Sequence, residues 1–275
     1  MLVISEGLKL VIHGVTDVGL NREHNEDAIS WDMKMGLVLL ADGMGGHNAG
    51  EVASALAVDS VRTSLADVVT PEIVASGIVN YCDAVRDAVD FANQEIHEQS
   101  HERPECAGMG TTMAVALFLD HKVVLAHVGD SRIYRLRGNE LKQVTSDHSL
   151  VQEMIDNGYL SEEEAQVSTS RNLITRALGI ANEVEIDICE ENTEVGDIYL
   201  LCSDGLSDMV SDQDILETLS ANTVDMETAA QMLVDKANQN GGNDNISVVL
   251  AAMYKAYSED SDFDDSTTLE IEPGD

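Results

Sequence analysis

Short apolar runs and paired helical stretches follow one another along the chain in an order that restricts its fold. Eight runs bounded by Gly, Asp or Asn predict strands, at residues 8–17, 35–42, 111–119, 122–129, 132–138, 183–190, 197–204 and 245–253. Apolar residues at three- and four-residue spacing predict helices in two blocks, at 49–65 with 71–98 and at 211–219 with 226–240. Because the helices come in pairs and do not follow every strand, the order argues against a parallel sheet of repeated βαβ units.

This order favours an α+β fold of two antiparallel sheets packed face to face. Helix pairs would cover the outer faces and complete a four-layer α/β/β/α sandwich. The length of 275 residues and the apolar fraction of 44% suit one large domain, predicted at residues 1–257. Within it, the polar stretch 148–171 predicts a small flap; beyond it, residues 258–275 carry eight acidic and no basic side chains and predict a disordered tail.

The charge and cysteine content exclude several classes of function. With 51 acidic and 15 basic residues, the formal net charge is −36, which argues against a nucleic-acid partner. Most of these acids are expected on the solvated surface, because no single site uses so many. The four cysteines form no CxxC pair, which argues against a zinc knuckle or a disulfide framework and favours the cytoplasm. No basic leader and no run of about 18 apolar residues is present, so neither secretion nor membrane insertion is expected.

Aspartates recur where predicted strands end. Asp42 with Gly43, Asp130 and Asp204 each follow an apolar run, and Asp244 lies just before the last one. A strand end fixes the backbone, and a neighbouring glycine leaves its carbonyl exposed, so such positions collect oxygen ligands for hard cations. Carboxylates converging at one edge would repel one another unless cations lay between them. The sequence therefore predicts a metal site built from these four aspartates.

A simpler interpretation exists for each position taken alone. An isolated Asp-Gly pair after a strand is usually an ordinary turn. In the motif LCSDGLSD, Ser203 or Asp204 is also a candidate helix N-cap, a role compatible with metal binding. The recurrence at several strand ends is what favours a metal site over separate turns.

Motifs throughout the chain resemble the metal-dependent protein phosphatase family, also called the protein phosphatase 2C family, and in particular its compact bacterial members. The resemblance covers residues 10 to 253 and has the order TDVGLNREHNED, ADGMGGHNAGEVAS, GMGTTMAVAL, AHVGDSRIYRL, VTSDHS, ITRALG, LLCSDGLSDMV and GGNDNISVVL. It implies an α/β/β/α sandwich with its site in the cleft between the sheets, in agreement with the fold predicted from the residues.

The resemblance assigns metal-binding roles to the same aspartates. It implies that Asp42 bridges two metals, that Gly43 supplies a backbone carbonyl, and that Asp204 and Asp244 complete the second metal site. Asp130, together with Asp204, matches the third-metal site of bacterial members. The implied cofactors are Mn²⁺ or Mg²⁺, as two core ions and a third.

Three further residues near the amino terminus match the family's site. Asp27 resembles the acid that holds metal-bound water, and Glu26 matches a position that is a metal-site carboxylate in some members. Arg22 matches the phosphate-binding arginine, suited to a bidentate grip on phosphoryl oxygens. Catalytic roles are expected for Arg22 with Asp42, Asp204 and Asp244.

The implied activity is hydrolysis of phosphoserine and phosphothreonine in proteins by a metal-activated water. No CxxxxxR loop is present for a phosphocysteine mechanism. The expected partners are phosphoproteins, including a Ser/Thr kinase of the same cell, and the expected state is a monomer. Two alternatives stay open: a catalytically inactive binding module, for which losses among the metal aspartates would be expected, and a metal-dependent phosphohydrolase acting on nucleotides or sugars.

Other motif residues are expected to support the site. Arg132 and Arg176 are expected to brace aspartates or the flap. Thr111 and Thr112 are expected to pack beside the site.

The proton donor to the leaving group is not assigned, because Met44 stands where many eukaryotic members carry a histidine. His47 and His148 are weak candidates, and a metal-bound water is the alternative. In the tail, Thr268 and Ile271 have a spacing read by some phosphothreonine-binding domains; a solubilising tail is the simpler interpretation.

Overall fold

Two antiparallel sheets form the centre of the protein in the computed structural model, which describes residues 2–5, 8–45, 49–161, 164 and 173–255. The first sheet has the order β1 (Leu2–Ser5), β2 (Leu8–Asp17), β12 (Ile246–Lys255), β11 (Ile198–Cys202), β8 (Arg132–Arg137) and β9 (Glu140–Gln143). The second has the order β10 (Asp187–Asn192), β7 (Lys122–Val128), β6 (Met113–Leu119), β4 (Leu37–Met44) and β3 (Asp27–Asp32), with β5 (Gly110–Thr111) paired to β4.

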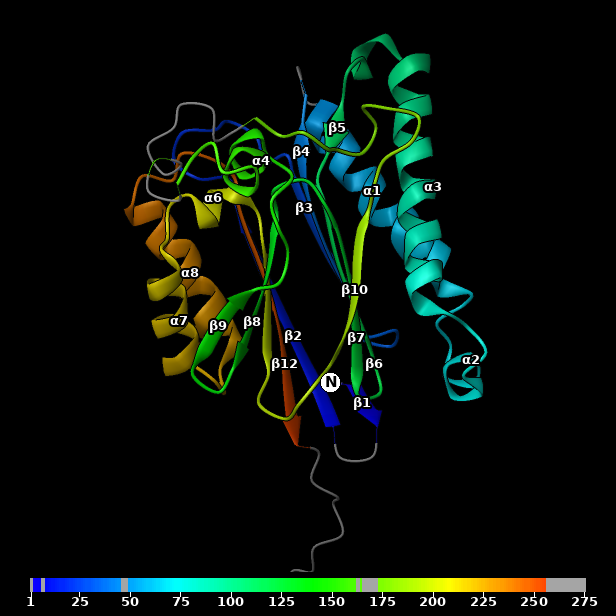
Figure 1. Ribbon diagram of the computed structural model, residues 1–275, viewed down its shortest axis with the longest axis vertical. Helices are drawn as coiled ribbons and strands as arrows, with labels where there is room; N and C mark the ends of the chain where they lie inside the picture. The colour runs from blue at the N-terminus through cyan, green and yellow to red at the C-terminus, as the bar shows by residue number, and fades with distance from the viewer. Residues whose placement is uncertain (1, 6–7, 46–48, 162–163, 165–172, 256–275) are drawn as a thin grey trace, which may run out of the picture.

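Helices cover both outer faces, so the molecule has four layers (Figure 1). One pair, α1 (Ala49–Ala66) and α3 (Tyr81–Glu102), packs on the second sheet, and the other pair, α7 (Asp212–Ala221) and α8 (Met226–Gln239), packs on the first. The predicted four-layer α/β/β/α sandwich is confirmed. Within the described residues, no helix is both long and apolar enough to span a membrane.

The alternation of side chains along each strand divides the interior into three apolar layers. In β4, Leu37 and Leu39 pack towards the α1–α3 pair, whereas Val38 and Leu40 face the other sheet. β11 behaves in the same way, with Leu200 on the helix side and Leu201 between the sheets. Continuous apolar runs therefore mark strands that are buried on both faces.

The structure also differs from the sequence prediction in several elements. The edge strands β3 and β9 were not predicted, because they are short and carry few apolar residues. The single helix expected at 71–98 is two helices: α2 (Pro71–Ser76) ends at Gly77, whose φ of 64° is left-handed, and Asn80 caps α3 through the N–H groups of Cys82 and Asp83. The strand expected at 183–190 begins four residues later, at Asp187.

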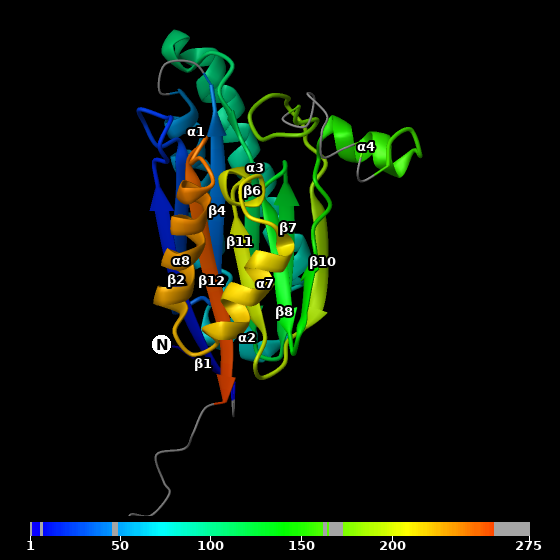
Figure 2. The ribbon, with the colours of Figure 1, turned by 90° about the vertical axis from the view of Figure 1, so that its left-hand side faces the viewer.

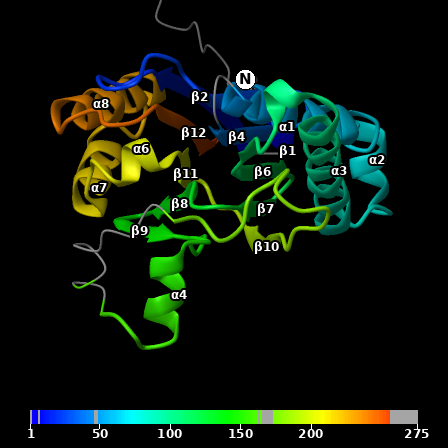
Figure 3. The same ribbon diagram turned by 90° about the horizontal axis from the view of Figure 1, so that it is seen from above.

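Besides α2, the described connections contain three short helices, and two predicted segments are not fully described. They are η1 (Pro104–Cys106), α4 (Leu150–Asp156) and α6 (Asp204–Ser207). Helix α4 projects from the sandwich beside β9 and β10 (Figures 2 and 3) and belongs to the segment predicted as a flap. The rest of that segment is only partly described, and the predicted tail at 258–275 lies outside the described residues.

Replacing Phe118 tests the layer between the sheets. Its ring is 1% exposed and meets the ring of Tyr199 edge-on, with 5.3 Å between centroids. We expect Phe118→Ala to lower the free energy of unfolding by about 3–5 kcal/mol, because a cavity opens in a close-packed layer. Urea denaturation in the presence of a chelator measures this value. Phe91→Ala, on an α3 side chain that is 46% exposed, is the control and should change it by about 0.5 kcal/mol or less; equal effects would contradict the assignment.

Candidate metal centre between the sheets

At one end of the sandwich, the positions that face the space between the sheets change from apolar to polar. Asp42 follows Leu40 by two residues in β4, and Ser203 follows Leu201 by two at the end of β11, so each faces the same way as its apolar neighbour. Ser247 begins the corresponding face of β12. The apolar layer therefore ends in a polar region enclosed by both sheets.

Asp27 joins Asp42 in this region through strand register. The two residues are opposite each other in the β3–β4 pair, so their side chains share a face. Across the gap, Ser203 Oγ donates to Asp27 Oδ2 at 2.9 Å and accepts from the N–H of Ser247 at 3.0 Å. Ser203 occupies the N-cap position of α6, but its side chain makes no capping bond. The hydroxyl thus connects the two sheets.

Five aspartates, from five different segments of the chain, gather here. Burial raises the pKa of Asp42 well above its ordinary value, and the charges of Asp27, Asp204, Asp130 and Asp244 raise it further. Burial also raises the pKa of Asp204 well above the usual range, with contributions from Asp130 and Asp244. Burial raises the pKa of Asp27 to about 6, although hydrogen bonds from Ser247 and Ser203 act to lower it. Burial, with a smaller contribution from the charge of Asp147, raises the pKa of Asp130 to about 6. So many buried carboxylates ionise together only if positive charge is supplied.

The unpaired atoms of the cluster fit divalent cations. Within the described part of the chain, Asp27 Oδ1 and Asp204 Oδ1 are buried and have no hydrogen-bond partner. The aspartates offer only oxygen ligands, which suit Mg²⁺ and Mn²⁺ better than softer metals. Asp208 is the last residue of the motif LCSDGLSD, and the sequence analysis did not single it out. Its charge raises the pKa values of both Asp130 and Asp204. The residues present therefore fit the metals expected from the sequence.

Gly43 and Glu26 lie where the loop before β3 meets the start of α1. The N–H of Gly43 donates to the carbonyl of Glu26 at 3.1 Å. A Cβ on Gly43 would lie 2.2 Å from the carbonyl oxygen of Gly50, so only glycine fits. A Cβ on Gly50 would in turn lie 2.6 Å from Glu26 Oε2, so a second glycine, which the sequence analysis did not single out, makes room for this carboxylate.

Arg22 lies at the rim of the cluster. Its Nη2 donates to Asp244 Oδ2 at 2.6 Å, and its side chain is 50% exposed. The other carboxylate oxygen of Asp244 accepts from the N–H of Asn245 at 2.8 Å. The structure therefore places the expected phosphate-binding arginine against one of the expected metal ligands, with half of its surface open to solvent.

Asn245 is a buried organiser of the site that sequence reasoning missed. Its side-chain N–H groups donate to the carbonyls of Val18 and His24, each at 2.9 Å, and its Oδ1 accepts from the N–H of Glu26 at 2.8 Å. It thereby fixes the loop that carries Arg22 and Glu26. The only signal in the sequence was its position beside Asp244 in GGNDN, where it was interpreted as the first residue of a strand.

The two threonines hold the backbone of Asp42, as expected for supporting residues. Thr111 Oγ1 donates to the Asp42 carbonyl at 2.8 Å, and Thr112 Oγ1 accepts from the Asp42 N–H at 2.9 Å. Thr112 Oγ1 also lies 2.7 Å from Ser131 Oγ, the neighbour of Asp130. One hydroxyl therefore links the segments that carry two of the aspartates.

The remaining arginines make supporting ion pairs. Arg132 forms a two-pronged pair with Asp147, with its Nη2 2.7 Å from Oδ2, and Nη1 donates to the hydroxyl of Tyr134. Arg176 pairs with Glu185 and Asp187, each at 3.1 Å. Both arginines act as braces, as expected.

The histidine candidates for proton donation are not placed for that role by any contact described. Nδ1 of His148 accepts from the N–H of Gly129, and Nε2 faces Asp187. His47 lies outside the described residues. Met44, at the end of β4, is half-buried.

Comparisons with known proteins agree with this geometry. Residues 20–240 match the family described as Protein phosphatase 2C. Protein phosphatase PhpP of Streptococcus pneumoniae is 36% identical over 250 residues, which are 89% of this chain and 98% of that protein.

Two solved structures share both sequence and fold. The serine/threonine phosphatase PstP/Ppp of Mycobacterium tuberculosis has 41% identity and a TM-score of 0.78, over 90% of this chain and 98% of that one. The catalytic domain of PstP in complex with two manganese ions has 40% identity and a TM-score of 0.79, over 90% and 99%. The match over most of the chain, the shared fold and the buried aspartates lead to one conclusion: the chain belongs to the protein phosphatase 2C family.

Proposed function

We propose that the protein is a serine/threonine phosphatase that hydrolyses phosphoserine and phosphothreonine in proteins at a centre of Mn²⁺ or Mg²⁺ ions. The observation that carries this proposal is the group of five aspartates between the sheets, in which burial and mutual repulsion raise the pKa values of Asp42 and Asp204. The names of the relatives support the reaction, and the two manganese ions of PstP support the cofactor.

The chain's own residues divide the work at such a centre. Asp42, Asp204 and Asp244, with the carbonyl of Gly43, would hold two core ions, and Asp130 would hold a third together with Asp204. When bound, such ions lower the pKa of a water and neutralise charge on the phosphoryl group. Asp27, fixed by the Ser203 hydroxyl, would orient that water.

Two side chains at the rim complete the assignment. Glu26 would contribute a further carboxylate beside α1. Arg22 would bind phosphoryl oxygens, because only part of its five-donor fork is engaged by Asp244 and its side chain is half exposed. No side chain is assigned as proton donor to the leaving group, and water fills that role.

The biological setting belongs to the same proposal. We infer a cytoplasmic monomer whose partners include a Ser/Thr kinase and its phosphorylated targets. The catalytic domain spans residues 1–257, and residues 258–275 form an acidic tail. The high density of acidic residues along the chain supports the exclusion of nucleic acid.

Removing one metal carboxylate is the most direct test. Asp204→Asn should lower kcat with p-nitrophenyl phosphate and a phosphothreonine peptide by on the order of 100-fold or more, because the amide neither carries the charge nor replaces the ligand. Asp42→Asn and Asp244→Asn should behave alike. Asp235→Asn, on the exposed face of α8, is the control. Wild-type activity that survives a chelator, or that prefers nucleotides or sugar phosphates over the peptide, would count against the proposal.

Arg22→Ala separates substrate binding from metal binding. Loss of charge-assisted hydrogen bonds to phosphate should raise KM for p-nitrophenyl phosphate by about tenfold or more. Calorimetric titration should show that Mn²⁺ still binds, since the aspartates remain. Arg62→Ala, which removes an exposed arginine on α1, should leave KM unchanged. A variant with normal KM would remove Arg22 from the substrate site.

The negative charge of the protein predicts an unusual salt dependence. A net charge of −36 repels an anionic phosphopeptide at long range, and salt screens this repulsion over about 8–10 Å. We therefore expect kcat/KM for the peptide to rise with moderate ionic strength at saturating Mn²⁺. Stopped-flow or steady-state assays from low to moderate salt measure the trend. A steep fall would show that local attraction at the site dominates instead.

A further inference from the structure

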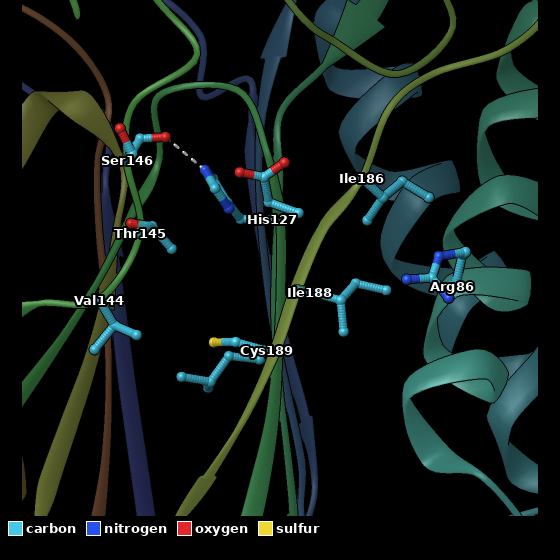
Figure 4. A pocket seen from close by; sticks show the side chains of 11 residues that line it. Arg86, His127, Val144, Thr145, Ser146, Ile186, Ile188 and Cys189 are labelled. Atoms are coloured by element: carbon cyan, nitrogen blue, oxygen red, sulfur yellow. Dashed lines mark hydrogen bonds between the residues drawn. The ribbon is translucent and has the colours of Figure 1, made fainter. Parts of the chain in front are cut away.

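A second group of titratable side chains lies outside the aspartate cluster, next to the start of α4. His127, near the end of β7, is opposite Asp187 of β10 in the strand register, and Nε2 of His148 lies 3.4 Å from Asp187 Oδ2. The ring of His148 stacks on that of His127, with 4.4 Å between centroids. A pocket of about 390 Å³ opens beside them, and Figure 4 shows the ring of His127 directed towards Ser146, whose carbonyl lies 2.9 Å from Nε2.

This group has the ligand types of a zinc site, with three potential ligand atoms within 4.8 Å of one another. The side chains of this group nevertheless form hydrogen bonds with other protein atoms. Nδ1 of His148 accepts from a backbone N–H, so Nε2 carries the proton, and it lies 3.4 Å from Asp187 Oδ2. The guanidinium of Arg176 lies 3.3 Å from that Nε2 and 3.1 Å from Asp187 Oδ1. The positive charge of Arg176 therefore lies where a metal ion would bind, and we interpret the group as a hydrogen-bonding network of side chains.

In this network, His148 makes two hydrogen bonds to a single residue, Gly129. Its backbone N–H donates to the carbonyl of Gly129 at 2.8 Å, and its Nδ1 accepts from the N–H of Gly129 at 3.1 Å. Both polar groups of one glycine are therefore held by one histidine. The burial of His148 lowers its pKa, with further lowering by His127 and Arg176, so the ring is neutral at pH 7 and Nδ1 stays an acceptor.

Gly129 immediately precedes Asp130, and the backbone around it is held on the other side too. Its φ of 105° is left-handed, and a Cβ there would lie 2.6 Å from Thr112 Cγ2, so glycine is needed. On the far side of Asp130, the hydroxyl of Ser131 lies 2.7 Å from that of Thr112. Asp130 therefore lies between Gly129, which is hydrogen-bonded to His148, and Ser131, which is hydrogen-bonded to Thr112.

The same histidine is attached to the segment that follows α4. The N–H of Thr175 donates to the carbonyl of His148 at 2.8 Å, and Leu178 exchanges two backbone hydrogen bonds with Thr111. Asn93 of α3 adds a bond from the N–H of Gly179. His148 therefore contacts both the segment that follows α4 and the loop that carries Asp130.

We propose that His148 is a positioning residue that directs the Asp130 carboxylate through the backbone N–H and carbonyl of Gly129 and so sets the affinity for the divalent cation that Asp130 would hold. The proposal rests on the proposed function for the role of Asp130. It assigns His148 neither a contact with substrate nor a proton transfer.

Two variants separate the two ring nitrogens. The amide oxygen of asparagine reaches the place of Nδ1, whereas that of glutamine reaches the place of Nε2. His148→Asn should keep the acceptor for Gly129, and His148→Gln should lose it while keeping a polar group near Arg176 and Asp187. His121→Gln, an exposed histidine 3.7 Å from Asp120, is the control.

Metal binding to chelator-treated protein is the first readout. By calorimetry or by electron paramagnetic resonance of Mn²⁺, His148→Gln should weaken the binding of one Mn²⁺ by about tenfold. His148→Asn and His121→Gln should bind as the wild type does. In the Asp130→Asn background, His148→Gln should add nothing, because the carboxylate that it positions is gone. Activity should show a higher Mn²⁺ requirement with unchanged KM at saturating metal.

Amide exchange gives a readout that needs neither metal nor activity. In metal-free wild type, the Gly129 N–H should be protected from exchange in ¹H–¹⁵N spectra, and it should lose protection in His148→Gln but not in His148→Asn. An unprotected Gly129 amide in the wild type, equal impairment of both variants, or an additive effect on Asp130→Asn would each overturn the proposal. If the wild type binds Mn²⁺ but hydrolyses no phosphoester, the proposed function fails while these binding and exchange tests still apply.

Discussion

The mutual repulsion of carboxylates that are buried between the sheets is the constraint on which the rest of the site depends. Asp42 and Asp204 are both held in a region from which water is largely excluded, and burial and neighbouring charge oppose their ionisation. A chain that needed only stability would fill this space with apolar residues, as it does a few positions away at Leu40 and Leu201. The cluster would therefore be stabilised by bound positive charge.

The sandwich makes this placement rigid. Strand register sets Asp27 opposite Asp42, and the single hydroxyl of Ser203 joins Asp27 to the other sheet. Thr112 holds the backbone of Asp42 and meets Ser131. Because hydrogen bonds hold the Asp27 carboxylate and the backbone of Asp42, the positions of these two residues are fixed without a bound metal.

The supporting network extends from the aspartates to the base of α4 by short steps. Thr112 is hydrogen-bonded to Ser131, Gly129 is hydrogen-bonded to His148, and His148 is hydrogen-bonded to Thr175. Ser131 and Gly129 flank Asp130 in the chain, and the other steps are hydrogen bonds. The network gives the segment that contains α4 a defined physical connection to Asp130, one of the proposed metal ligands, although α4 itself projects away from the centre (Figure 3).

The sequence by itself determined the layers and the kinds of ligand, because period-two burial and Asp-Gly strand ends are local patterns. It predicted eight strands and both helix pairs, and it singled out Asp42, Asp130, Asp204 and Asp244. Edge strands such as β3 were not predicted, since half-exposed strands carry weak apolar patterns. Only the tertiary structure decided that Asn245 fixes the Arg22 loop, that Gly50 makes room for Glu26, and that His148 holds Gly129. These contacts join residues far apart in the chain, and no local pattern encodes them.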